Sequence, residues 1–236
     1  MKKRIFRSED RGSADHGWLK AKHSFSFANY YDPEKIHFGK LRVLNDDIVK
    51  PKMGFGKHPH DNMEIVTIPL KGELAHEDST GNKEVIRQNE IQIMSAGSGL
   101  THSEFNNSDS EDVNLLQIWV LPKVKDIEPR YDQKIFEPAD RQNKIHTIVS
   151  PEKNENTLWI NQNAYFSLSE SDKDIDLKYD IKYNGNGVYV FIIDGKVKID
   201  GDILDKRDAV GIEDTDSFEI NVIEDSKILF IEIPMN

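Results

Sequence analysis

Short runs in which apolar and polar residues alternate recur along most of the chain. Three of them follow one another at residues 63–70, 73–77 and 83–87. Glycine or a cluster of turn-forming residues separates each run from the next. Residues 113–121 are largely apolar, which predicts a central strand, and the alternation of residues 175–181 predicts a half-buried one. No long segment has a convincing 3.6-residue period. This pattern predicts an all-β protein built as a sandwich or barrel.

A weak internal repeat divides these runs into two sets. Residues 68–78 resemble residues 191–200, since each is an apolar strand, a turn glycine and a second alternating strand. About twenty residues later, residues 90–94 resemble residues 208–212. Two matches in the same order favour two related β-domains. The polar stretch at residues 136–143 suggests the boundary, which gives domains of residues 1–136 and 137–236.

Two pairs of metal-ligand side chains stand out against this background: His58 with His60, and His102 with Glu104. Each pair has i, i+2 spacing, which in a strand puts both side chains on one face, about 6–7 Å apart at the backbone. Three imidazoles and one carboxylate make a mixed site that suits iron, manganese, copper, nickel or zinc. Histidines in turns are the alternative, but two pairs at matched spacing make it the weaker one.

The second half cannot repeat this set of ligands. His58 and His60 lie 14 and 12 residues before Gly72, and the same offsets from the repeat's Gly195 reach Ile181 and Tyr183. The last histidine of the chain is His146. The sequence therefore predicts one metal-binding domain and one domain without metal ligands.

Several other residues lie near the four candidate ligands in the sequence or are of a type that can bind metal. Glu64 shares the face of His60 by spacing, so it is a candidate fifth ligand and a better candidate for orienting an imidazole through a hydrogen bond. Asn106 has the same possible role, with a strand-end Asn that bonds nearby backbone as the alternative. The remaining histidines stand singly and are expected to be surface or packing residues: His16, His23, His37, His76 and His146.

Two further groups of residues have simpler interpretations. The aromatic residues Phe25, Phe27, Tyr30 and Tyr31 are expected to pack in the core, although they could wall a pocket for a flat ligand. The acidic doublets are expected in solvated turns, and they are Asp46 with Asp47, Glu111 with Asp112, and Asp214 with Asp216.

Composition narrows the class of protein. The net charge of −11 disfavours nucleic-acid binding through a broad basic face, but leaves a basic protein partner possible. The chain has no cysteine, which excludes disulfides and thiolate metal ligands. The first ten residues lack the apolar core of a signal peptide, and no run approaches the length of a membrane span. A cytoplasmic monomer without membrane contact is the expectation.

At this point the residues resemble a known family. Residues 54–72 and 97–106 are similar to the two motifs of cupins, and the chain more narrowly resembles the pirin family of two-domain cupins. The specific marks are residues 18–33, 41–47, 56–64, 94–104, 117–122 and 129–131. Ala96 stands where many cupins have proline, whereas the carboxylate at Glu104 is what pirins have. The match is strong over residues 12–136 and looser beyond.

The resemblance implies two tandem cupin (jelly-roll β-barrel) domains with one metal in the first. By position, its ligands would be His58, His60, His102 and Glu104. The ion is expected to be Fe(II), with Mn, Cu, Ni, Co and Zn as alternatives.

The bacterial branch of the family is similar to quercetin 2,3-dioxygenases, which open a flavonol ring with O₂ and release carbon monoxide. We therefore expect an oxidoreductase that takes a small flavonol-like substrate and O₂, with Glu104 accepting the hydroxyl proton. The alternative is a non-enzymatic metal or redox sensor that binds a protein partner, as in the regulatory branch of the family. An isomerase or storage cupin on the same scaffold is a third interpretation, because a fold does not fix its chemistry.

Overall fold

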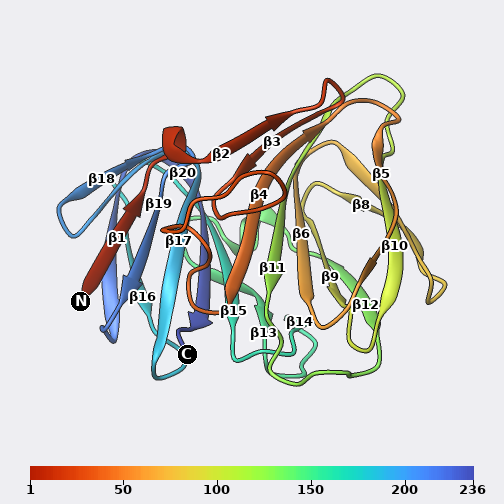
Figure 1. The fold of residues 1–236 in the computed structure, drawn as a ribbon. Coiled ribbons are helices and arrows are strands. Elements are labelled where there is room, and N and C mark those ends of the chain that lie inside the picture. Colours follow the sequence, from red (N-terminus) through yellow and green to blue (C-terminus); the bar gives the residue numbers. More distant parts are fainter.

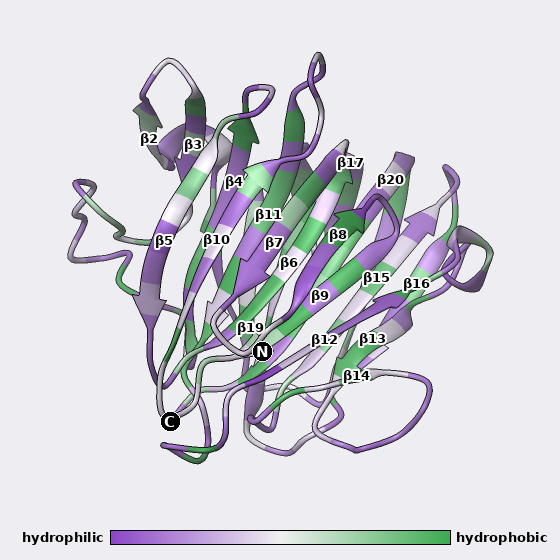
Figure 2. Cartoon of the chain, turned by 90° about the vertical axis from the view of Figure 1, so that its right-hand side faces the viewer, coloured by the Kyte–Doolittle hydropathy of each residue, from purple (hydrophilic) through white to green (hydrophobic).

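The computed structural model describes all residues 1–236 and contains twenty strands in three sheets (Figure 1). Only two 3-10 helices interrupt them, η1 (Ser8–Asp10) and η2 (Pro138–Asp140). Neither is long or apolar enough to cross a membrane. Along their length the strands change repeatedly between hydrophobic and hydrophilic residues, as the sequence pattern predicts (Figure 2). The expected all-β fold is confirmed.

Two sheets face each other in the first half of the chain. The larger has the order β12-β9-β6-β11-β4-β3-β2 and the smaller has the order β5-β10-β7-β8. The strands of the larger sheet are β2 (Gly12–Asp15), β3 (Leu19–His23), β4 (Leu41–Val49), β6 (Glu64–Lys71), β9 (Glu90–Ser95), β11 (Val113–Val120) and β12 (Arg130–Ile135). Those of the smaller are β5 (Gly54–His60), β7 (Glu73–Asp78), β8 (Lys83–Arg87) and β10 (Leu100–Asn106).

The third sheet builds the second half. Its main order is β1-β19-β17-β20-β15-β13-β14, with β16 beside β20 and β18 beside β17. The strands are β1 (Lys2–Phe6), β13 (His146–Ser150), β14 (Leu158–Trp159), β15 (Tyr165–Ser171), β16 (Asp176–Asp180), β17 (Asn186–Ile199), β18 (Asp202–Asp205), β19 (Ala209–Glu213) and β20 (Ser217–Pro234). The long strands β17 and β20 pair with each other along most of their length, with register shifts where they bend.

The first strand of the chain belongs to this third sheet. β1 pairs antiparallel with β19, from Lys2 opposite Glu213 to Phe6 opposite Ala209, and lies among the C-terminal strands in Figure 1. Phe6 is buried against Phe25 and Tyr189. The domain boundary between residues 136 and 137 stays a prediction. β1 is an exception to it, because this strand comes from the first half of the sequence but pairs with β19 in the sheet of the second half.

The internal repeat corresponds to equivalent elements. Gly72 separates β6 from β7, and Gly195 marks the bend inside β17. Both glycines have positive φ, at 79° and 86°, in the left-handed region that favours glycine. A Cβ atom on Gly195 would lie 2.2 Å from the carbonyl oxygen of Asp225, so a side chain there would clash.

The larger sheet of the first half is buried on both faces. One face, with Leu44, Val66 and Ile118, joins Phe166, Leu229 and other residues of the second half in a cluster of 27 buried residues. The opposite face looks into the interior of the first half, where the apolar clusters contain seven and four buried residues. The space between the halves is therefore the most extensive apolar region of the molecule, and it joins them into one body.

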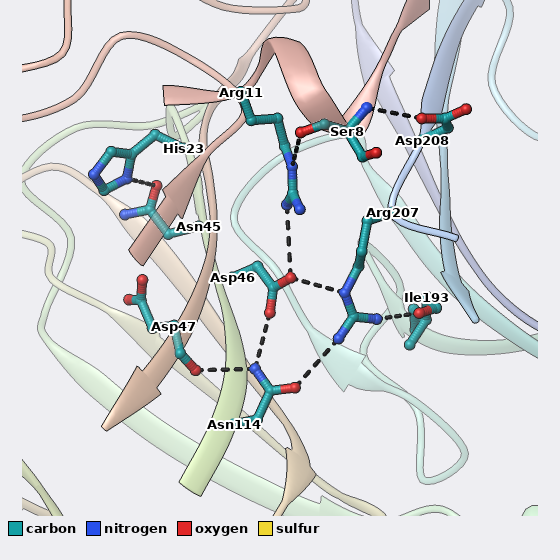
Figure 3. Close-up of polar contacts among 10 residues, drawn as sticks. All are labelled: Ser8, Arg11, His23, Asn45, Asp46, Asp47, Asn114, Ile193, Arg207 and Asp208. Carbon is teal, nitrogen blue, oxygen red and sulfur yellow. Dashed lines mark hydrogen bonds and ion pairs between the residues drawn. The ribbon is translucent and has the colours of Figure 1, made fainter. Parts of the chain in front are cut away.

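A buried ion pair also crosses between the halves. Arg207 donates from Nε to Asp46 Oδ2 at 2.8 Å and from one terminal nitrogen to Asn114 Oδ1 at 3.2 Å (Figure 3). Arg11 lies 3.6 Å from the same carboxylate oxygen. The side chains of Arg207 and Asp46 are only 18% and 10% exposed. The acidic doublet at Asp46 is thus inside a strand, which corrects the expected solvated turn.

Removing Arg207 tests this pair. We expect Arg207→Met to lower the free energy of unfolding by about 3 kcal/mol, because it leaves Asp46 buried with one cationic partner fewer. Lys206→Met is the matched control, since the neighbouring Lys206 pairs with Asp194 at the surface, and its change should stay within about 0.5 kcal/mol. Urea unfolding measures both, and equal small changes would contradict a structural role for the pair.

Candidate metal centre

Strands β5 and β10 bring the two predicted ligand pairs together. They are antiparallel neighbours in the smaller sheet, with His58 directly opposite His102 and His60 opposite Leu100. The register shifts between His102 and Glu104, where two residues of β5 face one residue of β10. Such a bulge twists a strand and redirects side chains, and bulges are common next to active sites.

The three imidazoles form a compact group. Ring centroids are 4.4 Å apart for His58 and His102, and 4.9 Å apart for each of the pairs His58–His60 and His60–His102. One ring nitrogen from each of the three lies within 4.8 Å of the others. That separation is compatible with coordination of a single ion.

A backbone contact sets the orientation of one of these rings. His58 Nδ1 lies 2.8 Å from the carbonyl oxygen of Gly56, and a carbonyl can only accept. Nδ1 therefore carries the proton, and the lone pair of Nε2 is available for a metal. This is the usual way in which a metal-binding histidine is held by its other ring nitrogen.

Buried polar atoms without partners mark the same position. His102 is 1% exposed and neither ring nitrogen has a hydrogen bond. Glu104 is 2% exposed; Gln117 donates to its Oε2 at 2.7 Å, while Oε1 has no partner. Leaving such groups unpaired in the interior is costly, and a divalent cation would satisfy them together. The donor set thus fits a metal ion.

Burial also sets the protonation states of these groups. Burial and, secondarily, His58 lower the pKa of His60 to about 4. Burial likewise lowers the pKa of His102 far below its usual range, with contributions from His58, His60 and His76. These two imidazoles are neutral at physiological pH and can coordinate without losing a proton. Burial raises the pKa of Glu104 to about 7, although the hydrogen bond from Gln117 acts in the opposite direction.

A fourth imidazole, His76, adjoins this group and was not expected there. It lies on β7 directly opposite Glu104 of β10, and its ring centroid is 5.2 Å from that of His102. His76 Nε2 is 3.2 Å from Asp78 Oδ2, and Nδ1 has no partner. Because an ionised carboxylate only accepts, Nε2 donates and Nδ1 presents its lone pair. His76, His102 and Glu104 also have donor atoms within 4.8 Å of one another.

The i, i+2 spacing of His76 and Asp78 was the one sequence feature that could have indicated His76 as part of the metal centre. It could not be interpreted without knowing that β7 is the second neighbour of β10. The other single histidines match expectation more closely. His16 and His37 are exposed and His146 is half-buried, whereas His23 is buried and hydrogen-bonded to Asn45 at 2.9 Å.

Glu64 takes a different place from the one expected. Its Oε2 accepts hydrogen bonds from the Ser95 hydroxyl at 2.8 Å and from the Asn161 backbone N–H at 3.1 Å, so it contacts the second half instead of an imidazole. The spacing argument fails because β5 ends at His60 and a turn intervenes, with Asn62 at a φ of 45°. The alternation of side chains between the two faces of a strand does not continue through a turn, and β6 belongs to the larger sheet whereas β5 belongs to the smaller one.

Asn106 is a strand-end asparagine that hydrogen-bonds nearby backbone, which was the alternative interpretation of this residue. Its Nδ2 donates to the carbonyl oxygens of Val49 and Glu111, at 2.9 and 2.8 Å, and its Oδ1 accepts from the Ser108 N–H at 2.9 Å. These bonds fix the chain beyond β10. Asn106 therefore holds backbone in place and does not orient a ligand.

A cavity of about 440 Å³ opens beside His58, His60 and Glu104. Aromatic rings form much of its wall: Phe27 packs edge-to-face on Trp119 with centroids 5.3 Å apart, and Trp18 does so on Phe55 at 5.4 Å. The aromatic group of the sequence is thus divided, because Phe27 lines the cavity while Phe25 is in the core and Tyr31 is 75% exposed. A flat, largely apolar molecule suits such walls.

Replacing His76 tests its part in the centre. If one nitrogen of His102 binds an ion, the other carries a proton, and His76 Nδ1 is the nearby acceptor without a partner. We expect His76→Leu to weaken Ni(II) binding by about 10- to 100-fold, as measured by competition with a chelator. His146→Leu, in the second half, should leave binding unchanged. Equal affinity in wild type and His76→Leu would show that His76 only packs.

The raised pKa of Glu104 predicts proton release on metal binding. Below pH 7 its carboxyl group is mostly protonated, and it must ionise in order to coordinate. At pH 6 we expect wild type to release about one proton more than Glu104→Gln on binding Ni(II), and at pH 8.5 the difference should vanish. Calorimetry in buffers of different ionisation enthalpy measures the count. A difference that does not depend on pH would contradict the assignment.

The sequence and the fold both match known proteins. A family model described as Pirin matches residues 5–120, and one described as Quercetinase C-terminal cupin domain matches residues 147–233. The chain is 39% identical to quercetin 2,3-dioxygenase of Escherichia coli strain K12 over 228 residues, with 97% of each chain covered. It is 38% identical to a pirin-like protein of Caulobacter vibrioides over 222 residues, covering 94% of this chain and 95% of the other.

Solved structures agree with these matches. The bacterial pirin YhhW from Escherichia coli in complex with nickel(II) superposes with a TM-score of 0.93, at 37% identity and with 99% of each chain covered. Another structure of YhhW gives a TM-score of 0.94 at 38% identity, covering 99% of this chain and 98% of the other. The predicted pair of cupin-type domains is confirmed, and a divalent-metal site is supported by the donor set and by the nickel complex. This chain is a member of the pirin family.

Proposed function

We propose that this protein is a metal-dependent dioxygenase that acts on flavonol-type phenols such as quercetin, with O₂ as co-substrate. The observation that carries the proposal is the buried carboxyl of Glu104, which has one unpartnered oxygen. A carboxylate oxygen of Glu104 lies within 4.8 Å of ring nitrogens of His76 and His102, and Glu104 lines an aromatic-walled cavity together with His58 and His60. The names of the full-length relatives agree with this activity.

The proposed ligands are His58, His60, His102 and Glu104, with Fe(II) as the expected native ion. Mn, Co, Ni, Cu and Zn suit the same donors, and nickel is the ion in the related structure. When bound, the metal would supply a Lewis acid for the substrate oxygen and a redox partner for O₂. His58 is only partly buried and lines the cavity with His60 and Glu104, so a bound ion would be accessible to a substrate in the cavity.

Glu104 is proposed as the base that takes the hydroxyl proton from the phenol. The hydrogen bond from Gln117 holds Oε2, so Oε1 is the oxygen that would bind the ion and, once released from the ion, would accept the proton. Burial raises the pKa of Glu104 to about 7, so this carboxylate is a stronger base than an exposed one.

The aromatic walls of the cavity are proposed to orient the substrate. Trp119 lies edge-on to His60, with ring centroids 4.9 Å apart, and joins the metal centre to the wall that contains Phe27. A flat ring system seated against these walls would direct its oxygen substituents toward Glu104 and displace water from the centre. The sensor alternative with a protein partner stays a prediction.

Turnover of quercetin in air tests the proposal. Protein reconstituted with Fe(II) should remove the flavonol absorbance and release carbon monoxide. Glu104→Gln should lower kcat by about 100-fold or more, because it removes the proton acceptor. Glu77→Gln, an exposed carboxyl on β7, is the control and should retain full activity. Wild-type protein with a full complement of metal that neither consumes quercetin nor releases carbon monoxide would refute the proposal.

A further inference from the structure

Adjacent carboxyl groups on β4 point to opposite sides of the larger sheet. Asp46 faces the second half, where Arg207 and Arg11 neutralise it and Asn114 Nδ2 donates to its Oδ1 at 2.8 Å (Figure 3). Asp47 faces the interior of the first half and lines the same cavity as Glu104. The hydrogen bonds of Asp46 and the bond from Asn114 to the Asp47 carbonyl oxygen, at 3.0 Å, fix this part of the strand.

The carboxyl group of Asp47 has no partner in the protein. Its residue is 3% exposed, and Oδ1 is buried without a hydrogen bond. In Figure 3 only its backbone carbonyl, not its carboxyl group, is joined to another residue. The residues directly opposite it on the two neighbouring strands are Ala21 on β3 and Leu115 on β11, and neither has a polar side chain.

The neighbouring polar residues of the cavity wall already form side-chain hydrogen bonds within the protein. His23 Nδ1 and Asn45 Oδ1 bond each other at 2.9 Å, and Gln117 Nε2 donates to Glu104. Asp47, Glu104 and Trp119 are the wall residues with a buried polar atom that has no partner, and Asp47 is the carboxyl among them that is not a proposed metal ligand. Burial raises its pKa to about 8, with Asp46 and Glu104 adding to the effect. A side chain of this kind in a folded interior needs a partner from elsewhere.

We propose that Asp47 binds a second hydroxyl group of the phenolic substrate and makes the cavity selective for polyhydroxylated rings. The proposal rests on the proposed function, because it places the reacting hydroxyl of the same molecule at Glu104. A carboxyl group pairs with a hydroxyl in either protonation state, as acceptor or as donor.

This assignment makes Asp47 a specificity-determining residue that costs stability. A buried carboxyl without a partner destabilises the free protein, and a leucine of similar size would not. A site that hydrogen-bonds a substrate hydroxyl also rejects an analogue that lacks it, because the polar group of the site is then left unpaired. Stability and selectivity should therefore change in opposite directions when Asp47 is replaced.

The test compares two flavonols on metal-loaded protein under nitrogen, by calorimetry. Quercetin has several hydroxyls, whereas 3-hydroxyflavone keeps only the one next to the carbonyl. We expect wild type to bind quercetin more tightly, and Asp47→Leu to weaken quercetin binding by about 10- to 100-fold while changing 3-hydroxyflavone binding by less than about threefold. Asp47→Asn, which keeps hydrogen-bonding atoms in place, should retain part of the preference.

Thermal unfolding provides the readout that a merely structural role would not reproduce. Asp47→Leu should melt at or above the temperature of wild type, and a lower melting temperature would show that Asp47 has an essential partner in the protein. An unchanged preference for quercetin in Asp47→Leu would overturn the assignment of Asp47 and leave the proposed function intact. Wild type that binds neither flavonol would overturn both. The Asp47→Asn measurement decides the selectivity if Asp47→Leu does not fold.

Discussion

The antiparallel pairing of β5 with β10 is the contact on which the metal centre depends. It places His58 opposite His102, and the bulge at Gly56 and Lys57 accommodates the change of register before Glu104. The second neighbour of β10, β7, contributes His76 from the other side. A slip of one residue in this pairing would turn every donor side chain away from its partners, so the register and the site are specified together.

The larger sheet of the first half has an apolar outer face and an inner face with polar side chains near the metal centre. Its outer face packs against the second half in a cluster of 27 buried residues, whereas its inner face carries Asp47, Asn45 and Gln117 toward the cavity. Apolar burial between the halves is therefore the main source of stability for a domain whose own interior is rich in unpaired polar groups. The second cupin contributes the other face of this cluster and the Arg207 side chain that neutralises Asp46.

The four residues that the sequence predicts as metal ligands share a local signal. His58, His60, His102 and Glu104 have i, i+2 spacing next to glycine-rich turns, and the period of two survives in the strands that they occupy. The repeat around Gly72 and Gly195 was equally visible, because both positions need the same backbone conformation. Strand geometry and turn chemistry act over a few residues, so the sequence contains them directly.

The residues that sequence reasoning misplaced depend on contacts between distant segments. His76 acquires its position from the pairing of β7 with β10, and β1 from its pairing with β19. The position of Glu64 was predicted by counting alternate residues from His60, but a turn between the two residues interrupts that alternation. Asp46 and Asp47 look like a solvated turn because burial of a carboxyl is unfavourable. In the structure the charge of Asp46 is neutralised by Arg207, which lies 161 residues away in the sequence, and Asp47 faces the cavity.

We propose that a single divalent ion is held by imidazoles and a carboxylate in the first cupin alone. X-ray absorption spectroscopy of the metal-loaded protein, with elemental analysis of the same sample, tests it most directly. One ion per chain is expected, with nitrogen and oxygen neighbours at about 2.0–2.2 Å and the multiple scattering of about three imidazoles. Two ions per chain, or a coordination shell without imidazole, would contradict it.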